Sequence, residues 1–144
     1  MLTVALLAVG CGGSDPTGPD PDGGGDPGTS TRVIKTAPSF ATDINEIFQR
    51  NGCSGSGCHG AAGGQAGLML TASATANYPM LVDAQATSES FLRVAKGDAA
   101  ASYLVIKLEG NQLVGQRMPR GGTPLDNIDI TNIKNWINNG APQN

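Results

Sequence analysis

Apolar side chains gather at two places in the chain with the spacing of a helix. Between residues 39 and 50, four of them recur at i, i+4, i+7 and i+8 and so share one helix face. These are Phe40, Ile44, Ile47 and Phe48. Asn51 and Gly52 come next, a pair typical of a helix end. The pattern therefore predicts a helix from Ser39 to Arg50.

The second stripe lies near the C-terminus, and its members are again spaced as one face of a helix. They are Ile130, Ile133, Trp136 and Ile137. Asp126 stands at the expected N-cap with Asp129 three residues later, and Gly140 with Pro142 supplies the stop. We expect this terminal helix to pair with the helix at 39–50.

The segments between the two stripes are less regular. Gly60–Gly67 is too rich in glycine for stable regular structure, and a short helix is predicted over Tyr78–Asp83. Gly97 and Asp98 resemble a cap, so a further helix is predicted over Ala99–Glu109, ending at Gly110. No internal repeat or strand-rich segment is present, which favours the all-α class.

The first residues have the pattern of an export signal. Leu2–Val9 is an apolar stretch too short to span a bilayer, and it leads into Ala8-Val9-Gly10-Cys11. That ending resembles a bacterial lipobox, in which the cysteine is lipidated. A buried apolar strand is the alternative, but the Gly/Pro/Asp tract that follows leaves it nothing to pack against. We therefore expect residues 1–11 to be a signal peptide and Cys11 to carry a lipid anchor to a membrane.

Residues 12–31 contain only Gly, Pro, Asp, Ser and Thr. A segment of this composition has no apolar face to bury, so we expect a disordered linker with a reach of about 25 Å. The remaining residues, 32–144, form the predicted folded domain.

Composition limits the kind of domain that can form. The chain has 144 residues, 39% hydrophobic and 4% aromatic, with 21 glycines and 9 prolines, so a single core short of bulky side chains is expected. The net charge of −3 arises in the linker, which holds four aspartates and no basic residue. Nothing resembles the basic surface of a nucleic-acid-binding protein.

Candidate chemistry is concentrated in Cys53-Ser54-Gly55-Ser56-Gly57-Cys58-His59, which contains the only histidine in the chain. Two cysteines followed by histidine form the attachment signature of a c-type haem. The thiols add to the porphyrin vinyl groups, and the imidazole binds iron from the same side. The usual spacing is C-x2-C-H, so two residues must bulge outward here, which Ser and Gly tolerate. With Cys11 lipidated, Cys53 and Cys58 remain as a pair that is either haem-linked or a disulfide.

Met118 is the strongest candidate for a second iron ligand. Thioether sulfur is a soft neutral ligand, and the chain offers no second imidazole. Met118 precedes Pro119, which favours an extended backbone, and it lies in a glycine-bracketed loop that can approach a flat cofactor. Met69 lies between two leucines, where packing accounts for it. Met69, Met80 and an open iron stay as alternatives.

From about Phe40 to Pro142 the chain resembles a small class I-type cytochrome c, most closely the planctomycete-type cytochrome c domains. The matching blocks are Phe48, Asn51-Gly52-Cys53, Cys58-His59-Gly60, Gly67-Leu68-Met69-Leu70, Tyr103-Leu104, Lys107-Leu108, Gly115-Gln116-Arg117-Met118-Pro119, Gly121-Gly122, Leu125, Ile130, Ile133, Trp136-Ile137 and Gly140-Ala141.

The resemblance implies a mostly helical fold around one covalently bound haem c, with crossed N- and C-terminal helices. It also implies His59 as the proximal ligand and Met118 as the distal ligand. In mitochondrial-type cytochromes the carbonyl oxygen of a Gly-Pro pair accepts a hydrogen bond from the proximal imidazole. This chain lacks that pair and has Ala66-Gly67 near the corresponding position. We expect another backbone carbonyl to take that role.

These observations favour an exported electron carrier, periplasmic or at the cell surface, that exchanges single electrons with extracytoplasmic redox proteins. Because both axial positions are filled, neither catalysis nor a small-molecule substrate is expected. The main alternative is an exported interaction domain stapled by a Cys53–Cys58 disulfide and lacking haem. An open iron would give a peroxidase-like or gas-sensing site. A zinc site is disfavoured, because Cys53, Cys58 and His59 lack a fourth Cys or His ligand.

Overall fold

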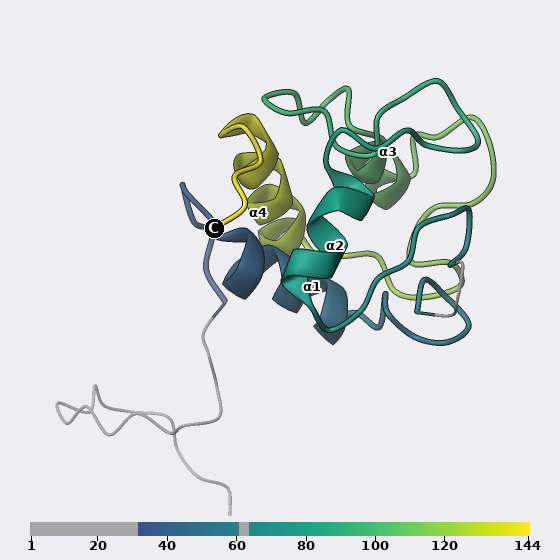
Figure 1. The fold of residues 1–144 in the computed structure, drawn as a ribbon, viewed down its shortest axis with the longest axis horizontal. Coiled ribbons are helices and arrows are strands. Elements are labelled where there is room, and N and C mark those ends of the chain that lie inside the picture. The colour runs from purple at the N-terminus through teal and green to yellow at the C-terminus, as the bar shows by residue number, and fades with distance from the viewer. Residues whose placement is uncertain (1–31, 61–63) are drawn as a thin grey trace, which may run out of the picture. The chain divides into compact units, whose positions relative to one another are not determined.

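The structure is a computed structural model that describes residues 32–60 and 64–144 (Figure 1). Residues 32–144 form one compact unit. The predicted signal peptide, the lipidated Cys11 and the linker 12–31 lie outside the described residues.

The described residues contain four α-helices, one π-helical turn and isolated β-bridges, but no sheet. The prediction of the all-α class is therefore confirmed. The elements in chain order are η1 (Phe40–Ile44), α1 (Asn45–Arg50), α2 (Ala74–Leu81), α3 (Tyr103–Glu109) and α4 (Asn127–Asn138).

The helix predicted at 39–50 is present as η1 continued by α1. All four residues of its apolar stripe are buried, from Phe40 to Phe48. At its start the side chain of Asp43 accepts a hydrogen bond from the backbone N–H of Ser39, which satisfies a donor left free at the helix end. At its end the side chain of Asn51 donates to the carbonyl oxygen of Ile47, 2.9 Å away. The segment ends at Arg50 as predicted and starts one residue later than predicted, at Phe40, with Ser39 as its N-cap.

Helix α4 follows the cap read from the sequence. The carboxylate of Asp126 accepts a hydrogen bond of 3.0 Å from the backbone N–H of Asp129. Ile133, Trp136 and Ile137 have no exposed surface, so this helix contributes its apolar stripe to the centre of the core.

The first and last helical segments pack on each other through aromatic rings. Phe40 of η1 stacks on Trp136 of α4, with ring centroids 5.0 Å apart, and meets Tyr78 of α2 edge-on at 5.2 Å. The indole N–H of Trp136 donates to the carbonyl oxygen of Pro142, so the buried ring has no unsatisfied donor. In Figure 1 α4 lies beside the blue helical segment at 40–50, as this ring contact requires.

Two predicted helices have different boundaries. The helix predicted over Tyr78–Asp83 is α2, which starts at Ala74 because the hydroxyl of Ser73 accepts from the backbone N–H of Ala76. It stops at Leu81, because Val82 has an extended backbone and Asp83 has a φ of 56°.

The helix predicted over Ala99–Glu109 is α3, which starts only at Tyr103. Asp98 caps a separate turn through the backbone N–H of Ala101, and the hydroxyl of Ser102 bonds the carbonyl oxygen of Asp98 at 2.7 Å. These side-chain bonds compete with helical ones and delay the helix. Gly110, with a φ of 84°, ends α3 as predicted.

Within the described part of the chain, none of the helices has the length and apolar character needed to cross a membrane.

Candidate functional site

The cysteine loop, residues 53–59, leaves directly from the end of α1. The backbone N–H of Cys53 donates to the carbonyl oxygen of Phe48 at 2.9 Å, which continues the helix into the loop. The backbone N–H of His59 donates to the carbonyl oxygen of Cys53 at 3.0 Å, so the two ends of the loop are closed on each other. The intervening Gly55–Gly57 are exposed, as expected for an outward bulge.

Backbone hydrogen bonds fix the shape of the bulge. The carbonyl oxygen of Gly55 accepts from the N–H groups of Cys58 and Gly60, at 2.9 Å and 3.0 Å. The backbone at Gly60 passes so close to Ser54 that an added Cβ would lie 1.8 Å from the Ser54 carbonyl oxygen. A glycine at position 60 is therefore required by this close approach.

The two thiols of the loop differ in environment. Both cysteines are free in the structure, with Cys58 exposed and Cys53 partly buried against the hydrophobic core. Burial, with a smaller contribution from Cys58, raises the pKa of the Cys53 thiol to about 11. Cys53 is therefore a protonated thiol at neutral pH rather than a thiolate.

The ring of His59 is oriented by a backbone carbonyl. Its Nδ1 atom lies 3.1 Å from the carbonyl oxygen of Leu68. Since a carbonyl only accepts hydrogen bonds, Nδ1 is the donor, and in the neutral ring Nε2 then has the lone pair that can bind a metal. The carbonyl oxygen of His59 also accepts from the N–H of Leu70 at 2.8 Å, so the residue is held at both its ring and its backbone.

The turn at 64–68 brings the Leu68 carbonyl to this place. Gly64 has a φ of 55°, and an added Cβ would lie 1.9 Å from the carbonyl oxygen of Leu68. At the outer side of the turn the carbonyl oxygen of Ala66 accepts from Thr87 Oγ1 and Arg93 Nη2, at 3.1 Å and 3.0 Å. The acceptor for His59 is therefore part of a fixed turn.

Met118 lies in the loop between α3 and α4. Its backbone N–H donates to the carbonyl oxygen of Lys107 at 2.9 Å, which pins it to the last turn of α3. Its side chain is half-buried and packs against the hydrophobic core, as do the side chains of Cys53 and Leu68. The core thus joins the start of the cysteine loop, the turn that orients His59 and the methionine.

The other two candidate methionines have distinct positions. Met69 is 37% exposed, because the extended segment alternates and turns Leu70 inward instead. The expectation that packing accounts for Met69 is therefore wrong. Met80 is half-buried in α2.

Asp129 of α4 holds the end of α1 that leads into the cysteine loop. The sequence pattern indicated for it only a role at the start of a helix. It is 2% exposed, and its carboxylate accepts from Arg50 Nη2 at 2.8 Å and from Asn51 Nδ2 at 3.2 Å. Arg32 Nη1 reaches the same carboxylate at 3.2 Å. The end of α1 that enters the cysteine loop is therefore attached to α4.

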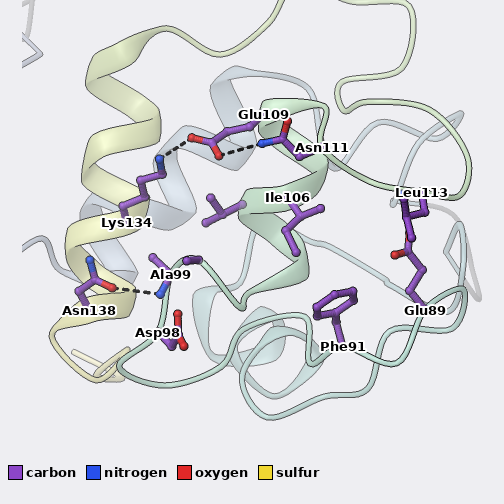
Figure 2. Close-up of a pocket in the computed structure, with 12 residues that line it drawn as sticks. Glu89, Phe91, Asp98, Ala99, Ile106, Glu109, Asn111, Leu113, Lys134 and Asn138 are labelled. Atoms are coloured by element: carbon purple, nitrogen blue, oxygen red, sulfur yellow. Dashed lines mark hydrogen bonds and ion pairs between the residues drawn. The ribbon is translucent and has the colours of Figure 1, made fainter.

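A pocket of about 590 Å³ lies on another part of the surface, beside α3 and α4 (Figure 2). Its lining includes Phe91, Ile106 and Leu113 together with the ion pair of Glu109 and Lys134. Among the described residues, neither the cysteine loop nor Met69, Met80 or Met118 lines it. No pattern in the sequence indicated this pocket, because its walls come from segments far apart in the chain.

In the ranges 32–60 and 64–144, no group of three or more His, Cys, Asp and Glu side chains is arranged to hold a metal ion. Comparisons with protein-family models, with curated proteins and with solved structures found no match to this chain.

Proposed function

We propose that the domain at residues 32–144 is a mono-haem c-type cytochrome that carries single electrons between extracytoplasmic redox proteins. The observation that carries the proposal is the orientation of His59 by the Leu68 carbonyl oxygen, at 3.1 Å, directly after a pair of free cysteines. A metal-binding histidine needs its second nitrogen held in this way, since the hydrogen bond fixes both tautomer and ring direction. A histidine incidental to a disulfide loop has no such need.

The residues of the cysteine loop fit covalent haem attachment. Cys53 and Cys58 would each form a thioether, and the closed loop keeps His59 beside Cys53. The exposed Gly55–Gly57 bulge accommodates the unusual spacing without disturbing α1.

The residues around Met118 fit the other side of the haem. Cys53, Leu68, Leu104 and Met118 are half-buried and pack on the core, and a flat apolar group bound between His59 and Met118 would cover their exposed parts. His59 would supply nitrogen and Met118 sulfur to the iron, and this pair raises the potential relative to two imidazoles.

Bound haem supplies an iron that gains and loses one electron. In the chain, His59 and Met118 would hold the iron, and the half-buried apolar side chains beside them would surround the haem. If His59 and Met118 both bind the iron, no position is open to a small molecule, so we propose a carrier rather than an enzyme. The cytochrome c-like arrangement, with the η1–α1 segment crossing α4, belongs to the same proposal.

The location proposed for this carrier comes from the sequence alone. The signal-like residues 1–11, with a lipid on Cys11, would anchor the protein to a membrane outside the cytoplasm, either in the periplasm or at the cell surface. Haem linkage of cysteines also suits such a compartment, because free thiols do not last there.

The disulfide-stapled interaction domain is the second candidate. A bond between Cys53 and Cys58 would close only a short loop and stabilise the domain little. It also gives no role to the hydrogen bond that orients His59. For these reasons the haem proposal accounts for more of the geometry.

The ligand assignment is tested on protein produced with a haem-maturation system and titrated electrochemically. The wild-type protein should show a sharp low-spin α band on reduction, and Met118→Ala should lower its potential. Met69→Ala is the control, because it removes the thioether of an exposed methionine that lies outside the methionine loop, and it should leave the potential unchanged. A Met118→Ala protein with the wild-type spectrum and potential would show that Met118 is not a ligand.

A further inference from the structure

The methionine loop, residues 111–118, is not held in place by burial of its own side chains. Leu113 is 91% exposed and Val114 is 50% exposed. The side-chain oxygen of Gln112 is buried, and among the described residues it has no hydrogen-bond partner. A loop that exposes its apolar groups and buries an unpaired polar one must be fixed by other contacts.

The two ends of this loop are tied to α3. The backbone N–H of Asn111 donates to the carbonyl oxygen of Ile106, and that of Met118 donates to the carbonyl oxygen of Lys107, each at 2.9 Å. The side chain of Lys107 also reaches the carbonyl oxygen of Val114 at 3.3 Å. These bonds close the loop at its base.

Glu89 holds the tip of the loop. Its Oε1 atom accepts from the backbone N–H groups of Leu113 and Val114, at 3.2 Å and 3.0 Å. Figure 2 shows the Glu89 side chain pointing toward Leu113 from the neighbouring segment. A carboxylate is a stronger acceptor than a neutral group, so these two bonds are the strongest tethers available to the tip.

Glu89 is in turn fixed by Tyr103. The phenol O–H of Tyr103 donates to the same Oε1 atom at 2.9 Å, and its ring is 9% exposed and stacks on Phe91 with centroids 6.0 Å apart. Lys107 Nζ lies 5.8 Å from the centroid of the Tyr103 ring. The Glu89 carboxylate therefore links Tyr103, the first residue of α3, to the tip of the methionine loop.

We propose that Glu89 is a positioning residue for Met118: by holding the tip of the methionine loop against Tyr103, it keeps the thioether of Met118 at the iron. This inference rests on the proposed function, because it presupposes that Met118 is the distal ligand. Glu89 touches neither haem nor ligand sulfur in this scheme and acts only through the loop.

The experiment measures the affinity of the ferric, haem-loaded protein for added imidazole, which binds iron only when the Met118 sulfur has left. Glu89→Ala removes the acceptor of three hydrogen bonds, so imidazole should bind about tenfold more tightly than to the wild type. Glu89→Gln keeps an oxygen acceptor without the charge and should give an intermediate affinity. Asp83→Asn removes an exposed carboxylate that pairs with Lys96, and it serves as the control for charge.

A second readout does not depend on the iron. Amide hydrogen exchange of Leu113 and Val114 should speed up in Glu89→Ala and stay unchanged in Asp83→Asn. If Glu89→Ala fails to fold, Tyr103→Phe takes its place: it removes one hydrogen bond to Glu89, keeps the ring and should tighten imidazole binding roughly twofold to fivefold.

The outcomes separate this inference from the proposed function. If Met118→Ala binds imidazole far more tightly than the wild type but Glu89→Ala does not, and exchange at Leu113 and Val114 is unchanged, the role of Glu89 is refuted while the cytochrome stands. If the matured protein carries no haem, or Met118→Ala binds imidazole like the wild type, the proposed function or its ligand is at fault.

Discussion

Arg50 at the end of α1 and Asp129 in α4 form a partly buried ion pair, with Nη2 of the arginine 2.8 Å from one carboxylate oxygen and 3.0 Å from the other. The guanidinium hydrogen bonds raise the pKa of Arg50, chiefly through Asp129. Asn51, the next residue, donates to the same carboxylate. The η1–α1 segment, which leads into the cysteine loop, is thus attached to α4 by this ion pair as well as by the stacking of Phe40 on Trp136.

We predict that Asp129→Asn destabilises the domain by about 2 kcal/mol, because it removes the buried carboxylate charge that accepts hydrogen bonds from both Arg50 and Asn51. Urea unfolding followed by circular dichroism measures the change. Glu46→Gln is the matched control, since Glu46 pairs with the same Arg50 at an exposed site, and its cost should stay below about 0.5 kcal/mol. Equal losses in the two variants would show that the burial of Asp129 does not matter.

Phe40→Leu should lower the free energy of unfolding by about 2 kcal/mol, because a fully buried ring loses contacts with both Trp136 and Tyr78. Phe91→Leu makes the same change at a ring that is 36% exposed, and about 0.5 kcal/mol is expected there. Thermal or urea unfolding compares the two variants. A larger effect at Phe91 would contradict the packing of η1 on α4.

Gly60→Ala should prevent the cysteine loop from closing, since the new Cβ would overlap the carbonyl oxygen of Ser54. We expect the yield of haem-loaded protein to fall strongly after co-expression with a maturation system. Gly57→Ala, in the same loop, meets no atom within 4 Å and should mature like the wild type. Normal maturation of Gly60→Ala would mean that the loop closes in a different way.

The pKa of Asp126 is lowered by the backbone N–H of Asp129 and by Arg32, so the folded state favours its ionised form. Its contribution to stability is complete above the pKa of an unfolded aspartate, about 3.9, and disappears as the pH falls through the lower folded value. Asp126→Asn should therefore lose less stability than the wild type between about pH 5 and pH 2. Urea midpoints across that range measure this, and parallel acid profiles would argue against the cap.

The sequence predicted the two terminal helices well because their evidence is local. The stripe from Phe40 to Phe48 and the Asp126 cap depend on neighbours a few residues away, and both are present. The helix over α3 was predicted too long, since nothing in the periodicity reveals that Ser102 bonds back to Asp98. Local sequence patterns therefore predict that a segment is helical more reliably than they predict the residue at which the helix begins.

For the candidate site, the sequence indicated the candidate ligands but not the groups that orient them. Cys53, Cys58 and His59 are adjacent in sequence, whereas the carbonyl that orients His59 belongs to Leu68, and the tether of the methionine loop belongs to Glu89. In that region, only Gly60 and Gly64 indicated the tertiary structure, since a side chain at either position would clash with the backbone of another segment. Which backbones meet is decided by tertiary packing and not by spacing.

The central claim is that this chain binds haem covalently through Cys53 and Cys58. The most direct measurement is the intact mass of the protein matured in an oxidising compartment that contains a cytochrome c maturation system, compared with Cys53→Ser/Cys58→Ser. We predict that the wild-type mass is greater than that of the unmodified polypeptide by one haem, and that the double variant lacks this addition. A colourless wild-type protein whose mass is lower by two hydrogen atoms would contradict the account and identify a disulfide instead.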